Sequence, residues 1–389
     1  MEFKQNLMHY KYSCFQKIFI AIAISLPIFL WSCGERKPDY HSVLPGHTHF
    51  QYTGRFDFSQ NNKARFAWTG SSISFAFKGA NCTAIFKNLS DIKDGYGKLQ
   101  SNFFDVTLDG KHTFLLETTN DSLVYPLVSN LKDTVHTIQI FKRTEAACGT
   151  VEFHGLRLDT GDYLIPIRKP YSRKIEFIGN SITCGYGNEG DSARCKFTPK
   201  TENGNKTFSA ITARNLKAEY VAIAMSGKGM VQNYNRENLE TMPRLYERIL
   251  PGDSLSQWNF SSWIPDAVVI NLGTNDFAHE NPDRVFFVSA YKNFLKRIRK
   301  NYPDKPIFCL TSPMVSDAYP KPRKVRTTLS NYIKNIIVDL EKEGYSKIYW
   351  HTLSEQGKLG LGCDFHPNLR QHKANADELT SFIRKKLGW

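Results

Sequence analysis

The chain has 389 residues, enough for two domains of ordinary size, and its composition is that of a globular rather than a disordered protein. Its formal net charge is +14, but the basic residues are scattered, and the densest runs, 296–300 and 321–326, lie beside no nucleic-acid-binding motif. These features exclude broad disorder and give no reason to expect a nucleic-acid partner.

The first 33 residues predict an export signal. Three lysines precede an uncharged apolar run from Ile18 to Trp31. Because this run is shorter than the roughly 20 residues that span a bilayer, a signal peptide fits better than a membrane-spanning helix. The run ends in "LWSCG", which resembles a bacterial lipoprotein box, although Trp31 is unusual there. We expect Cys33 to carry a lipid, the chain's only link to a membrane; an uncleaved anchor is the alternative.

The next segment predicts a linker followed by an all-β domain. The segment 34–44 is short and polar, as a linker would be. From 45 to about 165 apolar and polar residues alternate with the period of two that is typical of strands, as in 72–77. The alternation in 104–108 leads into Asp109-Gly110, a strong hairpin signal. Several short strands with turns between them predict a β-sandwich.

The rest of the chain, 172–389, alternates between strand-like and helix-like segments. Three expected strands are each followed by apolar residues at helical spacing. The strand 267–272 precedes the helix 287–298, the strand 307–310 precedes the helix 329–340, and the strand 348–351 precedes the helix 379–387. Strict alternation predicts a parallel sheet covered by helices on both faces, which is a three-layer α/β/α domain. In such sheets ligands bind beyond the carboxyl ends of the strands.

Residues suited to catalysis follow four of the expected strands. Ser181 lies in "IEFIGNSITCGYG", Gly227 in "SGKGM", Asn275 in "GTND", and Asp364 and His366 in "GCDFHPN". A hydroxyl, a glycine amide, a carboxamide and an imidazole beside a carboxylate are the groups that acyl transfer needs. We expect Ser181 to be the nucleophile, His366 its base and Asp364 the group that orients the imidazole.

The tetrahedral intermediate of acyl transfer carries negative charge on an oxygen, so donors must already point at it. The N–H groups of Ser181 and Gly227 and the side chain of Asn275 are the candidates, although Gly229 could take the place of Gly227. Simpler roles remain open: Ser181 could be a helix cap without a catalytic role, and Asn275 could be a turn residue without one. No spacing of cysteine or histidine suggests a metal site, and we expect no metal and no cofactor.

Six cysteines remain when Cys14 and Cys33 are set aside, an even number that allows disulfides in an oxidising compartment. Cys184 with Cys195 would close a short loop beside the candidate nucleophile. Cys82 with Cys148 would stay within the N-terminal half. The sequence does not fix the pairing.

In its order of blocks the chain resembles the SGNH (GDSL-type) hydrolases, and more closely carbohydrate esterase family 2. The resemblance rests on "GNSITCGYGNEG", "GTND" and the block "DFHPN". It implies a jelly-roll domain before the hydrolase domain, and an activity that removes acetyl groups from polysaccharides such as xylan and glucomannan, with a preference for sugar O6. By the same resemblance Phe365 would stack on a sugar ring, although it could simply pack its loop.

Two departures from the SGNH pattern concern the catalytic residues. Asn180 stands where the usual block has aspartate, and Asp364 precedes His366 by two residues, whereas three is the common spacing. Asp364 is therefore a less secure partner than His366 is a base.

We expect an exported, membrane-anchored lipoprotein in the periplasm or at the cell surface, acting on acetylated polysaccharides or oligosaccharides. A lipase or a peptidoglycan O-acetyl esterase would use the same groups. A surface glycan-binding lipoprotein with an inactive hydrolase domain is an alternative of a different class.

Overall fold

The structure is a computed structural model, and it describes residues 39–93, 97, 99–169 and 171–389. The expected signal sequence, Cys33 and residues 34–38 of the expected linker lie outside these residues. Tyr40–Trp389 forms one unit. Among the described residues no helix has the length and apolar character needed to cross a membrane.

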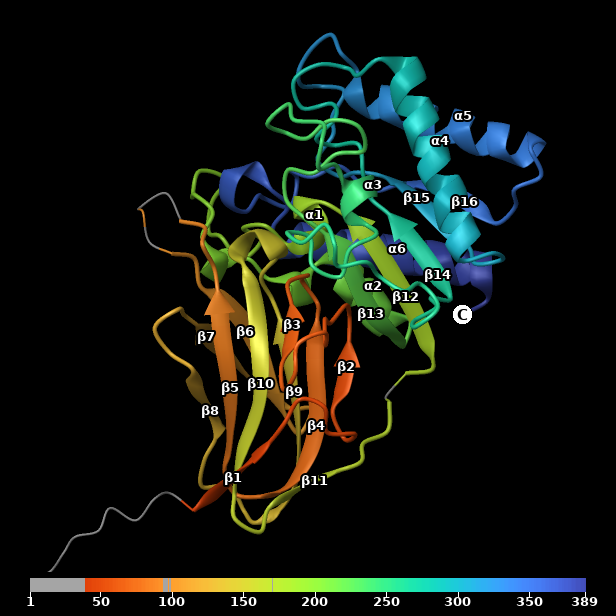
Figure 1. Ribbon diagram of the computed structural model, residues 1–389. Coiled ribbons are helices and arrows are strands. Elements are labelled where there is room, and N and C mark those ends of the chain that lie inside the picture. Colours follow the sequence, from red (N-terminus) through yellow and green to blue (C-terminus); the bar gives the residue numbers. More distant parts are fainter. Residues whose placement is uncertain (1–38, 94–96, 98, 170) are drawn as a thin grey trace, which may run out of the picture. The chain divides into compact units, whose positions relative to one another are not determined.

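The N-terminal region contains two antiparallel sheets (Figure 1). The strands of the first, in spatial order, are β1 (Tyr40–Val43), β10 (Thr150–Asp159), β5 (Cys82–Leu89) and β8 (Val124–Val128), with β3 (Ala64–Phe66) also paired to β10. The second runs β11 (Tyr163–Ile165), β4 (Ser72–Gly79), β9 (Thr134–Lys142), β6 (Asn102–Leu108) and β7 (His112–Thr118), with β2 (Gln51–Thr53) paired to β4.

Alternating apolar residues of both sheets meet in one core, which confirms the predicted β-sandwich. Phe75 of β4 and Phe153 of β10 are fully buried, and the rings of Phe86 and Phe104 stack at 5.3 Å. One boundary differs from expectation, because β1 lies inside the expected linker. Its backbone pairs with β10, yet only Val43 among its four residues is buried, so no hydrophobic pattern marks it.

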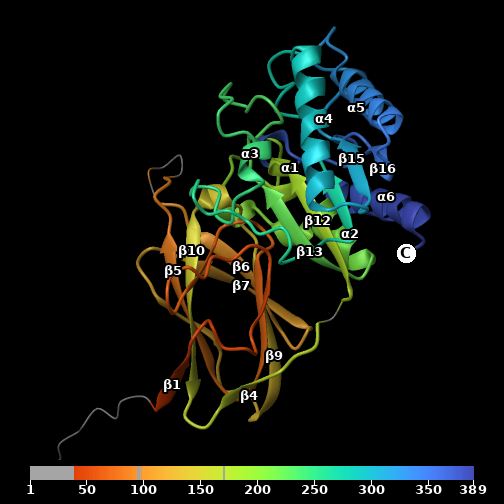
Figure 2. The same cartoon turned by 45° about the vertical axis from the view of Figure 1, so that its right-hand side comes forward.

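The C-terminal region contains a parallel sheet (Figure 2). In spatial order its strands are β13 (Ala218–Ala224), β12 (Arg173–Gly179), β14 (Ala267–Ile270), β15 (Ile307–Thr311) and β16 (Ile348–Thr352). Its α-helices are α1 (Ser181–Cys184), α2 (Phe208–Asn215), α3 (Met242–Leu245), α4 (Arg284–Asn301), α5 (Val325–Lys342) and α6 (Leu369–Leu387). The 3₁₀ turns are η1 (Ala146–Cys148), η2 (Pro199–Thr201), η3 (Gly204–Lys206) and η4 (Cys363–Phe365).

Helices cover both faces of this sheet, which confirms the predicted three-layer arrangement. Ile178 of β12 packs in a core with apolar residues of α4 and α5, such as Phe287 and Ile333. Phe177, the preceding residue, packs on the opposite face in a core with α2 and with Leu379 of α6. Adjacent residues of β12 thus belong to different cores, as the period of a strand requires.

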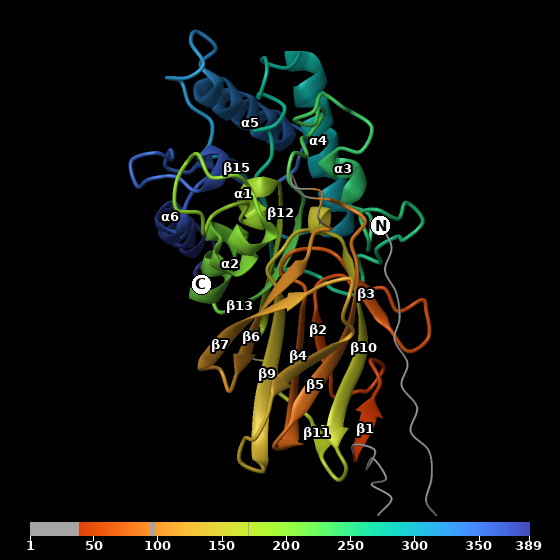
Figure 3. The same cartoon turned by 90° about the vertical axis from the view of Figure 1, so that its left-hand side faces the viewer.

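The N-terminal sheets lie against the C-terminal region (Figure 3). The boundary between the two regions contains buried charged side chains. One group, which we call the Arg55 cluster, joins the fully buried Arg55 to Glu176 of β12 at 3.2 Å, with Tyr246 donating to the same carboxylate. Burial raises the pKa of Glu176 although Arg55 opposes this. A second group, the Glu145 cluster, consists of Lys142, Glu145 and Glu202 and is also buried.

Candidate active site

The strand β12 delivers Ser181 to the carboxyl edge of the sheet. Asn180 caps α1, because its side chain accepts a hydrogen bond from the N–H of Ile182 at 3.3 Å. Gly185 ends the helix in the left-handed conformation, with φ of 87°. Since Asn180 provides the cap, the hydroxyl of Ser181 is not needed for it.

His366 lies beside this hydroxyl. Its Nε2 is 2.9 Å from Ser181 Oγ, and its ring lies tilted against that of Tyr186, with 4.3 Å between the ring centroids. Burial lowers the pKa of His366 to about 4 although contacts with Asp364 oppose this shift. A neutral imidazole at this distance can accept the proton of the hydroxyl, which is the arrangement a general base needs.

The structure differs from expectation in how Asp364 contacts His366. The main-chain carbonyl of Asp364, and not its carboxylate, lies 3.1 Å from His366 Nδ1. The carboxylate instead accepts hydrogen bonds from Lys196 Nζ at 3.0 Å, from the Phe197 N–H at 3.0 Å and from the Tyr186 hydroxyl at 3.1 Å.

The backbone explains this orientation. Asp364 and Phe365 both have positive φ, 48° and 61°, a conformation that non-glycine residues seldom adopt. These dihedrals direct the carboxylate of Asp364 toward residues 196–197. Burial raises its pKa, but the hydrogen bonds from Lys196 and Phe197 outweigh burial and lower the pKa below its usual value. The orienting acceptor for His366 is therefore a peptide carbonyl.

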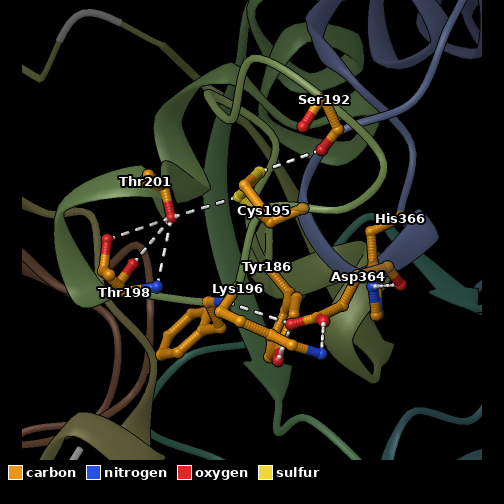
Figure 4. Close-up of a disulfide and its surroundings, with 10 residues drawn as sticks. Tyr186, Ser192, Cys195, Lys196, Thr198, Thr201, Asp364 and His366 are labelled. Atoms are coloured by element: carbon orange, nitrogen blue, oxygen red, sulfur yellow. Dashed lines mark hydrogen bonds and ion pairs between the residues drawn. A yellow bond between two sulfur atoms is a disulfide. The ribbon is translucent and has the colours of Figure 1, made fainter. Parts of the chain in front are cut away.

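A disulfide between Cys195 and Cys363 holds the segment 363–366, which we call the histidine loop (Figure 4). Backbone hydrogen bonds accompany it, from Asp364 N–H to the carbonyl of Cys195 at 2.9 Å and from Phe365 N–H to that of Ala193 at 3.1 Å. A side chain at Gly190 would collide with both sulfur atoms, so this glycine permits the close approach.

The two pairings that the sequence left open, Cys184 with Cys195 and Cys82 with Cys148, are not formed. Cys184 Sγ lies 3.7 Å from a carboxylate oxygen of Glu145 in the interior. Cys82 begins β5 at the end that pairs with the end of β10, whereas Cys148 precedes the start of β10, so the strand length separates them. Among the described residues the free cysteines are Cys82, Cys148, Cys184 and Cys309, all buried.

The neighbours of β12 carry the other two candidates. β13 and β14 flank β12, so the loops with Gly227 and Asn275 lie on either side of Ser181. Asn275 Nδ2 donates to the carbonyl of Lys228 at 2.8 Å, which ties the two loops together. The N–H of Gly229 donates to the Asn233 side chain at 3.1 Å, whereas that of Gly227 has no acceptor among the described residues. Of the two glycines, Gly227 is therefore the one with a donor to spare.

Three neighbours of the site were not singled out from the sequence. Tyr186 lies between His366 and Phe197. Asp276 accepts the N–H groups of residues 230, 231 and 232, and thereby fixes the loop 226–233, which we call the oxyanion loop. Glu145, which lies in the N-terminal region, accepts a hydrogen bond from the N–H of Ser226. The motifs "GYG" and "GTND" signal the first two, whereas no local motif marks Glu145.

One group of described residues has the donor set of a metal site. Ligand atoms of Glu145, Cys184 and Glu202 lie within 4.8 Å of one another, and all three residues are buried. Burial and the two carboxylates raise the pKa of the Cys184 thiol well above its usual value. A carboxylate oxygen of Glu145 accepts the N–H of Ser226, and one of Glu202 accepts the N–H of Glu145.

Two aromatic side chains near the candidate catalytic residues are exposed. Phe365, next to His366, is 57% exposed, and Tyr234, which directly follows the oxyanion loop, is 59% exposed. Neither packs its loop in the manner of a core residue. Exposed aromatic rings of this kind provide flat apolar surface to a bound ligand.

Two family profiles match the chain in succession. The profile of the carbohydrate esterase 2 N-terminal domain covers residues 52–167, and that of the GDSL-like lipase/acylhydrolase family covers residues 177–374. The second match spans half of the chain, and the two follow the N-terminal and C-terminal regions described above.

Solved structures agree with this assignment. A family two carbohydrate esterase from Clostridium thermocellum in complex with cellohexaose is 38% identical, with a TM-score of 0.80, over 87% of this chain and 99% of that one. A family 2 enzyme from Corynascus thermopiles is 32% identical, with a TM-score of 0.77, over 87% and 100%.

Curated relatives give the same picture. Cellulase/esterase CelE of Acetivibrio thermocellus is 38% identical over 339 residues, which are 87% of this chain but only 39% of CelE. An acetylxylan esterase / glucomannan deacetylase of Cellvibrio japonicus is 25% identical over 96% of this chain and 99% of its own. The chain belongs to carbohydrate esterase family 2, and its C-terminal region belongs to the GDSL-like lipase/acylhydrolase family.

Proposed function

We propose that this protein is a serine esterase that removes O-acetyl groups from a polysaccharide such as xylan or glucomannan. The observation that carries the proposal is the 2.9 Å contact between Ser181 Oγ and the neutral imidazole of His366. The names of the relatives from Cellvibrio japonicus support the two polymers as substrates.

The reaction has two halves. Ser181 Oγ attacks the acetyl carbonyl carbon while His366 Nε2 takes the hydroxyl proton. The intermediate collapses, the bond to the sugar oxygen breaks, and His366 returns the proton to that oxygen. Water then attacks the acetyl-serine with the help of the same imidazole, which releases acetate and restores Ser181.

Three donors stabilise charge in this proposal, and one carbonyl orients the imidazole. The N–H groups of Ser181 and Gly227 and the amide of Asn275 stabilise the oxyanion, and each donor is worth about 3–4 kcal/mol of the barrier. The main-chain carbonyl of Asp364 keeps the proton of neutral His366 on Nδ1, so that Nε2 remains an acceptor.

We propose that Phe365 contributes to glycan binding through its exposed ring. Phe365→Ala should raise KM for the polymer several-fold and leave kcat on p-nitrophenyl acetate unchanged. An equal loss of kcat/KM on the polymer and on p-nitrophenyl acetate would instead indicate that the ring only maintains the histidine loop.

We further propose that residues 1–33 direct export, that Cys33 is lipidated, and that the mature chain comprises a sandwich domain at 45–165, extended by β1, and a hydrolase domain at 172–389. The disulfide between Cys195 and Cys363 supports an oxidising compartment. Incorporation of an alkyne-labelled fatty acid in cells, with Cys33→Ser as control, tests the anchor; equal labelling of both proteins would rule Cys33 out.

The test of the function is acetate release from acetylated xylan and acetylated glucomannan by wild type and Ser181→Ala. We expect release by the wild type and a loss of at least about 10³-fold in the variant, with an unchanged circular dichroism spectrum. Equal release by both proteins would overturn the role of Ser181. Binding of both polymers with no release of acetate from any ester would indicate a glycan-binding protein instead.

A further inference from the structure

A carboxylate from the sandwich region reaches the underside of the oxyanion loop. Glu145 follows β9, and its side chain is buried. One of its carboxylate oxygens accepts a hydrogen bond from the N–H of Ser226 at 2.7 Å. Ser226 directly precedes Gly227, so this bond lies one peptide unit from the candidate oxyanion donor.

The same oxygen also contacts the helix that carries the nucleophile. Cys184 Sγ donates to it at 3.7 Å, and Cys184 is the last residue of α1, which Ser181 begins. A single carboxylate oxygen of Glu145 therefore contacts both segments that carry the main-chain oxyanion donors, those of Ser181 and Gly227. Because a carboxylate can accept several hydrogen bonds at once, it suits this double contact.

The segment that carries Glu145 is itself fixed. Lys142 Nζ donates to the carbonyls of Thr144 at 2.8 Å and of Glu145 at 3.0 Å, and the Glu145 N–H donates to a carboxylate oxygen of Glu202 at 2.8 Å. The carbonyl of Arg143 accepts the N–H of Gly204 at 2.9 Å. Bonds from both regions thus hold the carboxylate in one place.

The oxyanion loop needs such support because its second residue is a glycine. Gly227 has φ of 75° and no side chain that could pack against its surroundings. A displacement of about 1 Å in a catalytic group can cost about 10²-fold in rate, so the direction of this N–H must be held from outside the residue.

We propose that Glu145 is a positioning residue for the oxyanion hole, acting through Ser226 on the N–H of Gly227 without touching the substrate. The sandwich region then contributes to the rate of the reaction. This inference rests on the proposed esterase function.

Glu176 provides a matched control. It is a second fully buried glutamate at the same boundary, and it binds Arg55 and Tyr246 rather than any part of the oxyanion loop. Glu145→Asp and Glu176→Asp make the same chemical change, since each shortens a buried carboxylate by one methylene group. Both should lower the thermal midpoint, but only the first should withdraw an acceptor from the oxyanion loop.

The experiment measures kcat and KM on p-nitrophenyl acetate together with the affinity for butylboronic acid, which forms a tetrahedral adduct with a serine hydroxyl. Glu145→Asp should lower kcat about 10- to 100-fold with KM within twofold, and weaken the boronic acid by a similar factor. In Glu176→Asp, kcat, KM and the affinity for butylboronic acid should all stay within twofold of the wild-type values. Glu145→Gln keeps the length and a carbonyl oxygen for the Ser226 N–H, so it should restore kcat to within about threefold.

The inference is overturned if Glu145→Asp loses no more kcat than Glu176→Asp, or if Glu145→Gln is as impaired as Glu145→Asp. Should Glu145→Asp fail to fold, Glu145→Met keeps the length without the acceptor, and unchanged kcat in that variant would contradict the proposal. If the wild type hydrolyses no ester, the proposed function fails, and the boronic acid affinities of the variants still decide the role of Glu145.

Discussion

The histidine loop and the oxyanion loop lie at the same edge of the sheet but are held in different ways. The histidine loop is at the surface, with Phe365 exposed, and it is fixed by the disulfide of Cys363 and by backbone hydrogen bonds. The oxyanion loop rests on two buried carboxylates, those of Asp276 and Glu145, which together accept four of its N–H groups.

The difference follows from the surroundings. An exposed loop has little apolar surface to bury, and water competes for its hydrogen bonds, so a covalent link is an effective restraint. Away from water, hydrogen bonds to a charged acceptor are stronger, and a buried carboxylate can organise several backbone groups at once. The comparison predicts that the two loops fail differently when their supports are removed.

Among the changes that remove a support of either loop, the largest effect is expected for Asp276→Ala. It leaves the N–H groups of residues 230, 231 and 232 without their acceptor in a buried place. We expect the free energy of unfolding to fall by about 3 kcal/mol and kcat by about 10²-fold, measured by urea unfolding and by ester hydrolysis. Asp276→Asn, which keeps one oxygen, should lose less of both; equal losses would show that charge rather than the acceptor matters.

Replacing both disulfide cysteines, Cys195 and Cys363, by serine should lower kcat about tenfold, because His366 is three residues from Cys363 and loses its restraint. A reductant should lower the activity of the wild type to the level of the double variant and leave the variant unchanged. Full activity of the reduced wild type would mean that the backbone hydrogen bonds alone hold the loop.

The pH profile reports on the surroundings of the histidine. With a pKa of about 4, His366 stays neutral well below pH 6.5, so kcat/KM should hold to about pH 5 and then fall about tenfold per pH unit below 4. A midpoint near 6.5 would contradict this. Because folding lowers this pKa, the unfolded chain binds the proton first, and the contribution of His366 to stability falls as pH drops from 6.5 to about 4.

The smallest effect is expected for Asp364→Asn. The carboxylate does not contact His366, and the main-chain carbonyl that does is unaffected. We expect kcat to change by at most about threefold, in contrast to the loss of about 10⁴-fold known for carboxylates that bind the imidazole directly. Lys196→Ala removes the ion pair from the other side and serves as control; a large loss in Asp364→Asn alone would restore the carboxylate as the orienting group.

The sequence was informative wherever local pattern determines structure. Alternation with period two in β4 and helical spacing in α4 and α5 led to the correct layers, because the apolar side chains of an element must face its core. The order of blocks placed Ser181 and His366 on segments that the fold brings together.

Other features depend on contacts between distant segments. The pairing of Cys195 with Cys363 joins residues 168 apart, and short spacing pointed to Cys184 instead. Glu145 has no motif, since its partner Ser226 lies on another region of the chain. The carboxylate of Asp364 turns away because of two successive left-handed residues, a backbone property that residue types alone do not specify.

The buried charges between the two regions limit how this fold can be recombined during evolution. Arg143 binds Glu189 and the carbonyl of Glu202 across the boundary, and Arg55 binds Glu176 in the same way. A protein with the parallel sheet alone would leave Glu176, Glu189 and the carbonyl of Glu202 without these arginine partners. The match to the longer CelE protein extends over 339 residues, which is long enough to include both regions. This is expected if the two regions are inherited together as one unit.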